Sequence, residues 1–473
     1  MTEQKNEPFR GLPSVTELLK NQTVLAWLER HPHAVVTDCL RRAVDELREQ
    51  IRTSIKRGQA PPDISSENVI ARAKELLEQA AEPLVREVIN ATGVILHTGL
   101  GRAVFPESVV DSIIGALKGY VNLAIDRDTG RRIERDELIE PLLCELTGAE
   151  AATVVNNNAG ATLIVLAALA AGREVIVSRG QLIEIGGSFR LPDVMAQGGA
   201  RLVEVGTTNR THLKDYRNAI TPNTAAIMRV HPSNYRVVGF TSEVSLDELV
   251  GLAHANGLLL IDDLGAGALF DLRRVGLPHE PVARESIETG ADIVLFSADK
   301  LIGASQGGII LGRKDLIAKI RQHPLMRVLR VDKTCIMVLE RTLQLFRDLD
   351  KLQQVHPTYR MVTTPLTALR SRANALVQAL KEKAPAVSAE LCDSAAYLGS
   401  GSLPTEAIPS VAVRVCVPGL SADALARRLR LDPAAVFGRI ESDRVVLDMR
   451  TVRDDQVHAI AEAIARVAGA AGV

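Results

Sequence analysis

The alternation of short apolar runs with helical patterns, which begins near residue 86, constrains the fold more than any other feature. Helical patterns at 161–171 and 246–254 lie between the runs. Strands separated by helices are typical of right-handed crossovers onto a mostly parallel sheet. The sequence therefore predicts one large α/β domain with a seven-stranded sheet. The seven runs that suit buried strands are 152–155, 174–177, 202–205, 225–230, 258–261, 293–296 and 308–311.

The segments before and after this alternation have different patterns of predicted helices and strands. Before it, the pattern indicates helices at 14–29, 34–56 and 66–80, with no strand. After it come helices at 335–354, 366–382 and 455–467 and strands at 410–417 and 444–448. We therefore expect a helical domain over 1–85, the large α/β domain over 86–334, and a linking helix with a small α+β domain over 335–473.

Charge and composition exclude several classes of protein. Lys plus Arg total 56 against 57 Asp plus Glu, and aromatic residues make up 3%. We therefore expect no global positive field for a nucleic-acid partner, no DNA binding and no base-stacking platform. The five cysteines form no C-x-x-C pair, which disfavours a disulfide framework and a metal site and favours the reducing cytoplasm. The longest apolar stretch, around 163–171, is too short to span a membrane.

Small and polar residues follow the first predicted strand. Asn156, Asn157, Asn158 and Ala159 stand at the start of an apolar helical pattern. Free N–H groups at a helix start bind phosphate, and small side chains allow its close approach. Simple capping of the helix by asparagine explains the same residues equally well.

An acid and a lysine follow two further predicted strands. Asp263 comes after the run at 258–261 and Lys300 after the run at 293–296. Ligands of open α/β sheets lie at the carboxyl ends of the strands. Alone, each residue has an ordinary explanation, an Asx turn or a surface lysine. Together with a phosphate site, they are the groups that pyridoxal phosphate requires: an anchor for its phosphate, an acid for its ring nitrogen and a lysine for its aldehyde.

Two groups of arginines suit anionic ligands. Arg102 follows a glycine-rich segment, and Arg327 and Arg330 lie three residues apart, so that they share a face if their segment is helical. Guanidinium groups bind tetrahedral oxyanions well, although surface salt bridges are the common alternative. Arg41, Arg48 and Arg52 share one face of a predicted N-terminal helix, where nearby acids make a solvated surface the ordinary interpretation.

Two rival motifs fail on their context. Residues 303–307 fit G-x-S-x-G, but a nucleophile elbow needs a preceding strand and a following helix, and here a strand follows. Residues 99–101 lack the third glycine of a dinucleotide fingerprint, and the sequence has no Walker A pattern. Neither serine hydrolysis nor binding of NAD or ATP is indicated.

Several longer strings resemble one known family, the bacterial selenocysteine synthases, which are L-seryl-tRNA(Sec) selenium transferases of fold type I of the pyridoxal phosphate enzymes. The similarity runs through nearly the whole chain. It is most specific in G-T-T-N-R-T at 206–211 and L-R-V-D-K at 329–333, and includes N-N-N-A at 156–159 and G-S-L-P at 401–404.

The resemblance implies an activity and a role for each site residue. Lys300 would bind the cofactor aldehyde, Asp263 its ring nitrogen and the segment from Asn156 its phosphate, while Arg102, Arg327 and Arg330 would receive selenophosphate. The seryl group of Ser-tRNA(Sec) would lose its hydroxyl to give an aminoacrylyl-tRNA, to which selenium adds. The N-terminal domain would contact the tRNA, with Arg41, Arg48 and Arg52 as candidates, and the chains would form a cytoplasmic ring of dimers.

The sequence also departs from the family's pattern. Gly99, Ala266, Ala298 and the pairs at 124–125 and 304–305 stand where the family has other residues. Two alternatives follow. One is a pyridoxal phosphate lyase that acts on a small amino acid, and the other is an inactive tRNA-binding scaffold. The complete N-terminal segment disfavours the first, and retention of Lys300 and Asp263 disfavours the second.

Overall fold

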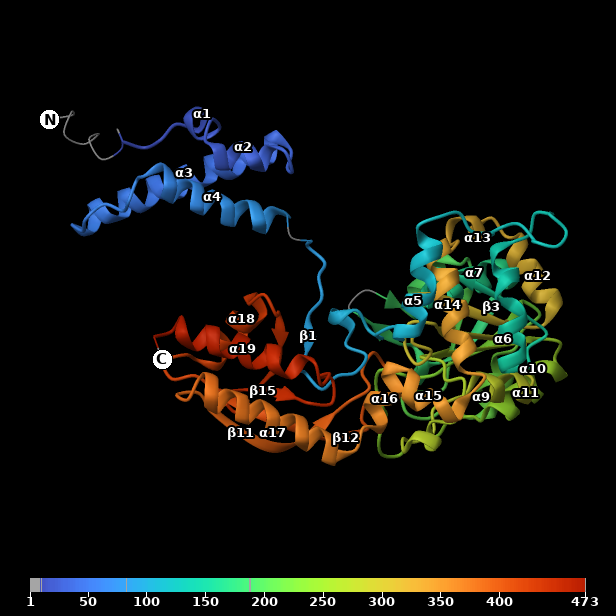
Figure 1. Cartoon of the computed structure of the whole chain (residues 1–473). Helices are drawn as coiled ribbons and strands as arrows, with labels where there is room; N and C mark the ends of the chain where they lie inside the picture. Colours follow the sequence, from blue (N-terminus) through green and yellow to red (C-terminus); the bar gives the residue numbers. More distant parts are fainter. Residues whose placement is uncertain (1–8, 10, 82, 187–188, 473) are drawn as a thin grey trace. The chain divides into compact units, whose positions relative to one another are not determined.

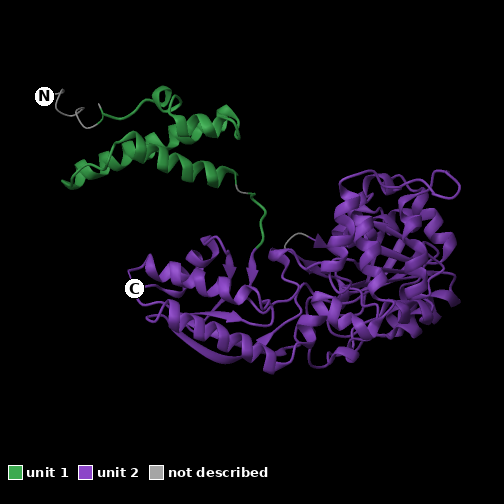
Figure 2. Ribbon diagram, in the orientation of Figure 1, with its two compact units in different colours: residues 1–87 green, residues 88–473 purple. Residues whose placement is uncertain are grey.

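The computed structural model describes residue 9 and residues 11–81, 83–186 and 189–472. The chain divides into two compact units, residues 1–87 and residues 88–473 (Figure 2). We describe each unit by itself. The domain boundaries expected at 85 and 334 stay predictions.

The first unit is helical (Figure 1). Its long helices α3 (His33–Arg57) and α4 (Ser66–Ala81) pack on each other through one apolar face each. The single helix predicted over 14–29 is wrong, because the chain forms α1 (Val15–Leu18) and α2 (Gln22–Leu28) there. Asn21 explains the break, since its side chain accepts the N–H of Thr23 at 2.9 Å and starts a new helix.

The second unit contains the predicted seven-stranded sheet, with strand order β2-β10-β9-β8-β7-β3-β6. All seven predicted runs are strands, and only β10 is antiparallel to its neighbours within this sheet. The sheet is therefore mostly parallel, as predicted. Its strands are β2 (Ala151–Val155), β3 (Glu174–Ser178), β6 (Arg201–Val205), β7 (Thr224–Val230), β8 (Leu259–Gly265), β9 (Ile293–Ser297) and β10 (Gly308–Gly312).

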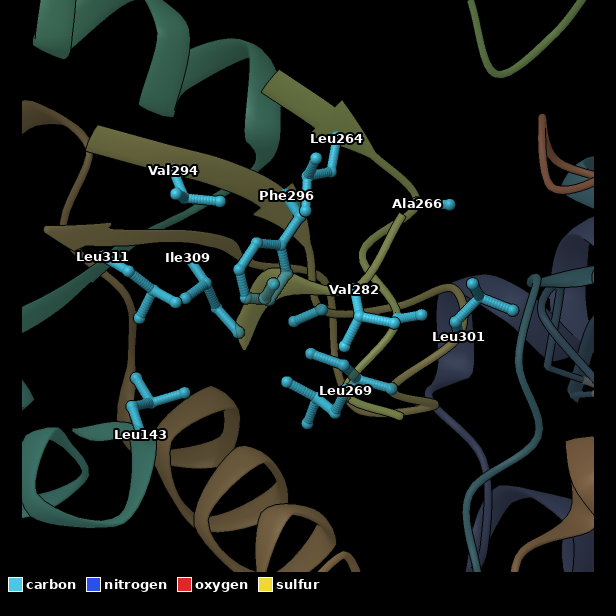
Figure 3. Close-up of a cluster of buried hydrophobic side chains, with 14 of the residues drawn as sticks. Leu143, Leu264, Ala266, Leu269, Val282, Val294, Phe296, Leu301, Ile309 and Leu311 are labelled. Atoms are coloured by element: carbon cyan, nitrogen blue, oxygen red, sulfur yellow. The ribbon is translucent and has the colours of Figure 1, made fainter. Parts of the chain in front are cut away.

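Both faces of this sheet are covered, which explains why its strands are apolar throughout. In β9, Val294 and Phe296 belong to the core on one face, and Ile293 and Leu295 to the core on the other. Figure 3 shows Phe296 surrounded by side chains of β8, β9 and β10. The first face carries α5 (Glu107–Leu117), α6 (Glu140–Thr147), α10 (Leu246–Ala255), α11 (Ala283–Thr289) and α14 (Lys333–Leu345); the second carries α7 (Asn158–Leu169), α8 (Leu191–Gln197) and α12 (Lys314–Gln322).

The linking helix predicted over 335–354 is broken. Helix α14 ends at Leu345 and α15 (Leu349–Val355) begins after Asp348, whose side chain accepts the N–H of Lys351. A cap inside a continuous apolar period therefore divided the helix. The chain continues through α16 (Pro357–Thr363) into α17 (Leu366–Lys383).

The C-terminal part is a four-stranded antiparallel sheet, ordered β11-β12-β15-β14 and packed on helices. The short strand β1 (Ile89–Asn90) pairs in parallel with β13 (Val436–Phe437), so the start of the second unit is attached to this C-terminal part. The other elements are β11 (Ser388–Ala396), β12 (Ile408–Cys416), α18 (Ala422–Leu431), β14 (Arg439–Glu441), β15 (Arg444–Asp448) and α19 (Gln456–Gly469).

The second unit also contains further short strands and helices. They are β4 (Glu184–Ile185), β5 (Phe189–Arg190), α9 (Leu213–Ala219) and α13 (Leu325–Val328). None of the helices in the described ranges is long and apolar enough to cross a membrane. All five cysteines are free.

Candidate active site

Lys300 lies three residues beyond β9 and is almost completely buried, with 6% of its surface exposed. Loss of hydration lowers the pKa of its amine, and the positive charge of Arg102 lowers it further. Asp299, Asp263 and Glu280 oppose this shift. A buried lysine with a lowered pKa is neutral more often than an exposed one, which suits an amine that must attack a carbonyl carbon.

Asp263 lies on the adjacent strand β8 and is also buried. Its Oδ1 accepts the side-chain amide of Asn158 at 2.9 Å and the N–H of Gly265 at 3.0 Å, and its Oδ2 accepts the Thr162 hydroxyl at 3.2 Å. Burial raises the pKa of this carboxyl, against the effect of these donors and of Lys300. A protonated ring nitrogen would supply the cation that stabilises the charged form.

Asp262, the neighbouring residue, has a different environment. Its carboxylate lies 2.9 Å from the Arg229 guanidinium and accepts the Ser286 hydroxyl at 2.7 Å. Successive side chains of a strand point to opposite faces, so Asp262 faces α11 while Asp263 faces α7. The two acids therefore have separate roles, and only Asp263 is near Lys300.

The asparagines predicted to bind phosphate lie at the start of α7, which begins at Asn158, with Asn156 before the N-cap. Asn157 is the N-cap, and its side chain accepts the N–H of Gly160 at 2.7 Å. The N–H groups of Asn158 and Ala159, in the first turn, have no partner within the helix. Asn158 also reaches Asp263, so the helix start and the acid are tied together. Capping and anion binding are both compatible with this geometry.

These residues fit pyridoxal phosphate. The Oδ1 atom of Asn158 and the Oγ atom of Ser233 are buried and have no hydrogen-bond partner within the described ranges. Ser233 is 1% exposed and lies against Gly265 and Gly401, where an added Cβ would come within 3.0 and 3.1 Å of its Oγ. Unpaired polar atoms beside a buried acid and lysine are what a polar ligand would satisfy. No cluster of metal-binding side chains occurs among the residues that the structure describes.

The predicted anion-binding arginines fall in two places. Arg102, which has a φ of 66°, donates to Asp299 at 2.5 Å, next to Lys300. Arg330 lies near Arg327, Arg132 and Arg135: loss of hydration lowers the pKa of its guanidinium, and these positive charges lower it further. Mutual repulsion of this kind is relieved by a bound anion. That all three predicted arginines bind one anion stays a prediction.

The predicted tRNA face lies on α3 and is exposed. Arg48 pairs with Asp45 at 2.7 Å and Arg52 with Glu49 at 3.1 Å, while Arg41 is also exposed. Exposed pairs within a helix are weak and can be replaced by contacts to phosphate. A role in RNA binding for Arg41, Arg48 and Arg52 stays a prediction.

Several residues of this site were not predicted from the sequence. Asp299 and Ser233 follow predicted strands, so the same rule about strand ends could have found them. Thr162 is four residues beyond Asn158 and therefore shares its helix face. Glu280 and Arg135 carry no local signal, because only the packing of distant segments brings them near.

A mostly parallel sheet of this order, with a buried lysine and a buried acid after adjacent strands and a helix start beside them, defines the class: a pyridoxal phosphate enzyme of the aminotransferase fold type. The family model described as "L-seryl-tRNA selenium transferase" matches residues 88–453, and the model "Selenocysteine synthase N terminal" matches residues 9–48. The chain belongs to the L-seryl-tRNA selenium transferase family.

Individual relatives agree with this assignment. An L-seryl-tRNA(Sec) selenium transferase of Rhizobium meliloti is 46% identical over 94% of this chain and 95% of its own length. An L-seryl-tRNA(Sec) selenium transferase of Geobacter sulfurreducens is 43% identical over 97% of this chain and 99% of its own length. Among solved structures, a D-glucosaminate-6-phosphate ammonia-lyase has a TM-score of 0.58 and 24% identity, covering 84% of this chain and 98% of its own, and it shares the fold. The predictions of family, fold class and cofactor are confirmed.

Proposed function

We propose that the chain converts L-seryl-tRNA(Sec) to L-selenocysteinyl-tRNA(Sec) with selenophosphate as the selenium donor. The observation that carries this proposal is the 46% identity over 94% of the chain to a relative of that name. The buried pair of Lys300 and Asp263, in a fold that binds pyridoxal phosphate, supports it. In the overall reaction the C–O bond of serine and the P–Se bond of the donor break, a C–Se bond forms, and the oxygen ends on phosphate.

Each site residue has a role in this proposal. Pyridoxal phosphate, when bound, supplies an aldehyde for amines and a ring that withdraws electrons from Cα. Lys300 would hold the aldehyde carbon and, once released, would move the Cα proton with its amine. Asp263 would keep the ring nitrogen protonated, and the start of α7 from Asn156 to Ala159 would hold the phosphate.

The remaining charged residues would bind the substrates. Arg327 and Arg330 stand among further guanidinium groups, and Arg102 stands beside Lys300. Guanidinium groups suit tetrahedral oxyanions, and in this proposal all three would hold selenophosphate and the leaving phosphate. Arg41, Arg48 and Arg52 would contact the tRNA. We further propose that the chains form a ring of dimers, which would present several such faces to one tRNA. We also propose that the reaction takes place in the cytoplasm, which the five free cysteines favour.

A lyase that acts on a small amino acid is the second candidate. The fold shared with an ammonia-lyase and the residues that depart from the family's pattern, such as Ala298 beside the site, favour it. The match of residues 9–48 to the N-terminal model favours the transferase, because a small-molecule lyase has no need of a tRNA-binding unit. A gel shift with tRNA(Sec) and tRNA(Ser) distinguishes the two, since a lyase would bind neither selectively.

The first test is the variant Lys300→Ala. We expect the purified parent to be yellow and to form selenocysteinyl-tRNA(Sec) from Ser-tRNA(Sec) and selenophosphate, and the variant to lose both properties. Lys381→Ala, which changes an exposed lysine of α17, serves as the control and should stay yellow. A variant at Lys300 that kept the full visible absorbance would contradict the assignment.

A further inference from the structure

The backbone turn that begins at Lys300 is held by side chains from outside the large sheet. The N–H of Gly303 donates to the carbonyl of Lys300 at 3.0 Å, which closes a turn with Leu301 and Ile302 at its centre. Tyr359 donates its hydroxyl to the carbonyl of Leu301 at 2.6 Å. Tyr359 belongs to α16, and His356, the residue before α16, contacts the same turn.

His356 holds the second central carbonyl. Its Nε2 lies 2.8 Å from the carbonyl oxygen of Ile302, and because a carbonyl only accepts, the proton must be on Nε2. The ring is fully buried, and burial lowers its pKa to about 4. The histidine therefore stays neutral and keeps the same donor throughout the neutral pH range.

The local sequence of the turn is matched to this histidine. Gly303 has a φ of +74°, and a Cβ added there would come within 2.3 Å of both Cε1 and Nε2 of His356. Glycine alone allows both the backbone conformation and the close approach of the ring. The imidazole of His356 can therefore approach this turn only because residue 303 is glycine.

The two clamping side chains are themselves rigidly packed. The rings of His356 and Tyr359 lie 4.9 Å apart, and Phe270 and Phe346 pack against them. At the other end of α16, Arg450 from the C-terminal part donates to the carbonyls of Met361 at 2.7 Å and Val362 at 3.0 Å. Helix α16 is therefore fixed at both ends.

We propose that His356 and Tyr359 are positioning residues for Lys300. By holding the carbonyls of Leu301 and Ile302, they fix the direction in which the amine of Lys300 meets the cofactor aldehyde. This inference rests on the proposed role of Lys300. A misplacement of a reacting group by about 1 Å can cost on the order of 100-fold in rate, so the loss of one clamp bond should be visible in the reaction of that amine.

The variant Tyr359→Phe tests the proposal, because it removes one hydroxyl and keeps the ring. Thr358→Val is the matched control: Thr358 is fully buried on the same helix, and its hydroxyl has no partner among the described residues. Pyridoxal phosphate is added to full-length apoprotein, and the yield of borohydride fixation on the Lys300 peptide is followed with time over a pH series. We expect fixation roughly 10-fold slower in Tyr359→Phe and unchanged in Thr358→Val.

A pair of variants at His356 gives a second, independent measurement. His356→Phe keeps a ring without a donor, whereas His356→Gln keeps an N–H donor, so Gln should restore part of the rate that Phe loses. Thermal unfolding of every variant is measured alongside. If Tyr359→Phe and His356→Phe, which both lack the donor, fix pyridoxal phosphate with the parent's rate and pH profile, the two side chains only pack the core and the proposal is wrong. If the parent itself gains no label on Lys300, the proposed function fails, and this inference fails with it.

Discussion

The adjacent aspartates of β8 have different roles: Asp263 belongs to the proposed active site, and Asp262 stabilises the fold. Asp263 accepts three donors beside Lys300 and faces the proposed cofactor, whereas Asp262 balances the charge of Arg229 in the core. Two neighbouring aspartates thus have different roles, one toward the cofactor and one in the core, because successive side chains of a strand point to opposite faces of the sheet.

We expect Asp263→Asn to weaken binding of pyridoxal phosphate about 10- to 100-fold while the fold is kept, because an amide cannot hold a protonated ring nitrogen as a carboxylate does. Asp262→Asn should show the opposite behaviour. It leaves Arg229 without its counter-charge and should lower the free energy of unfolding by about 3 kcal/mol, with cofactor affinity little changed. Titration of the visible absorbance and urea unfolding measure the two effects. Equal effects of the two variants on cofactor affinity would contradict this division.

The lowered pKa of Lys300 makes cofactor capture depend on pH. Only the neutral amine attacks an aldehyde, so the rate of fixation should rise with pH through a midpoint below the ordinary value of 10.5. Arg102→Ala removes a positive charge and leaves Asp299 unpaired, and both changes should move the midpoint to higher pH. Fixation rates measured from neutral to alkaline pH test this, and a midpoint that moved to lower pH would be inconsistent with it.

The same shift affects stability with a definite sign. The unfolded chain binds the proton of Lys300 more tightly than the folded chain does. Between the folded pKa and 10.5, the unfolded state therefore holds more protons, and this lysine's contribution to stability improves as the pH rises through that window.

At the scale of elements, the start of α7 is the part of the site that depends most on small residues. A Cβ added at Gly160 would come within 2.9 Å of Asn156 Oδ1 and 3.3 Å of Leu329 Cδ2. The first turn of α7, with the N–H groups proposed to bind phosphate, is therefore packed tightly on both sides.

We expect Gly160→Ala to weaken binding of pyridoxal phosphate about tenfold, or 1.4 kcal/mol, and to leave binding of pyridoxal, which lacks the phosphate, nearly unchanged. Gly251→Ala is the control, since Gly251 lies within α10 and a Cβ there meets nothing within 4 Å. That variant should keep the parent's affinity and gain up to about 1 kcal/mol of stability. Equal losses for both ligands in Gly160→Ala would mean that α7 does not bind the phosphate.

At the scale of the whole molecule, the proposed tRNA face belongs to the unit of residues 1–87 and the proposed active site to the unit of residues 88–473. Helix α3 carries its arginines on the exposed face of a unit that has its own apolar core. Changes on that face should therefore affect the RNA and not the cofactor.

Replacement of Arg41, Arg48 and Arg52 by alanine should weaken binding of tRNA(Sec) and reduce the slope of log K against log salt by about 1 for each phosphate that an arginine no longer neutralises. The yellow absorbance should stay at full strength. Arg370→Ala, an exposed arginine of α17, is the control. Gel shifts over a series of salt concentrations give the slopes, and an unchanged slope in the triple variant would remove α3 from the RNA-binding surface.

Much of this molecule follows from the sequence alone. All seven buried runs are strands, and Asp263 and Lys300 lie after adjacent strands, because the length and apolar character of a run are local properties. The strings that carry the family resemblance also belong to the sequence, and the family is confirmed. The breaks at Asn21 and Asp348 were missed because a single capping side chain outweighs a continuous apolar period.

Only the tertiary structure decided which distant residues meet. Arg102 pairs with Asp299 across 197 positions of the sequence, Asn158 with Asp263 across 105, and His356 with the turn after Lys300 across 54. Such pairings depend on the order of the strands and on the packing of segments between them, which local periodicity does not encode. The sequence thus determined the elements and the class of chemistry, while packing determined how the lysine, its acid and its charges are arranged.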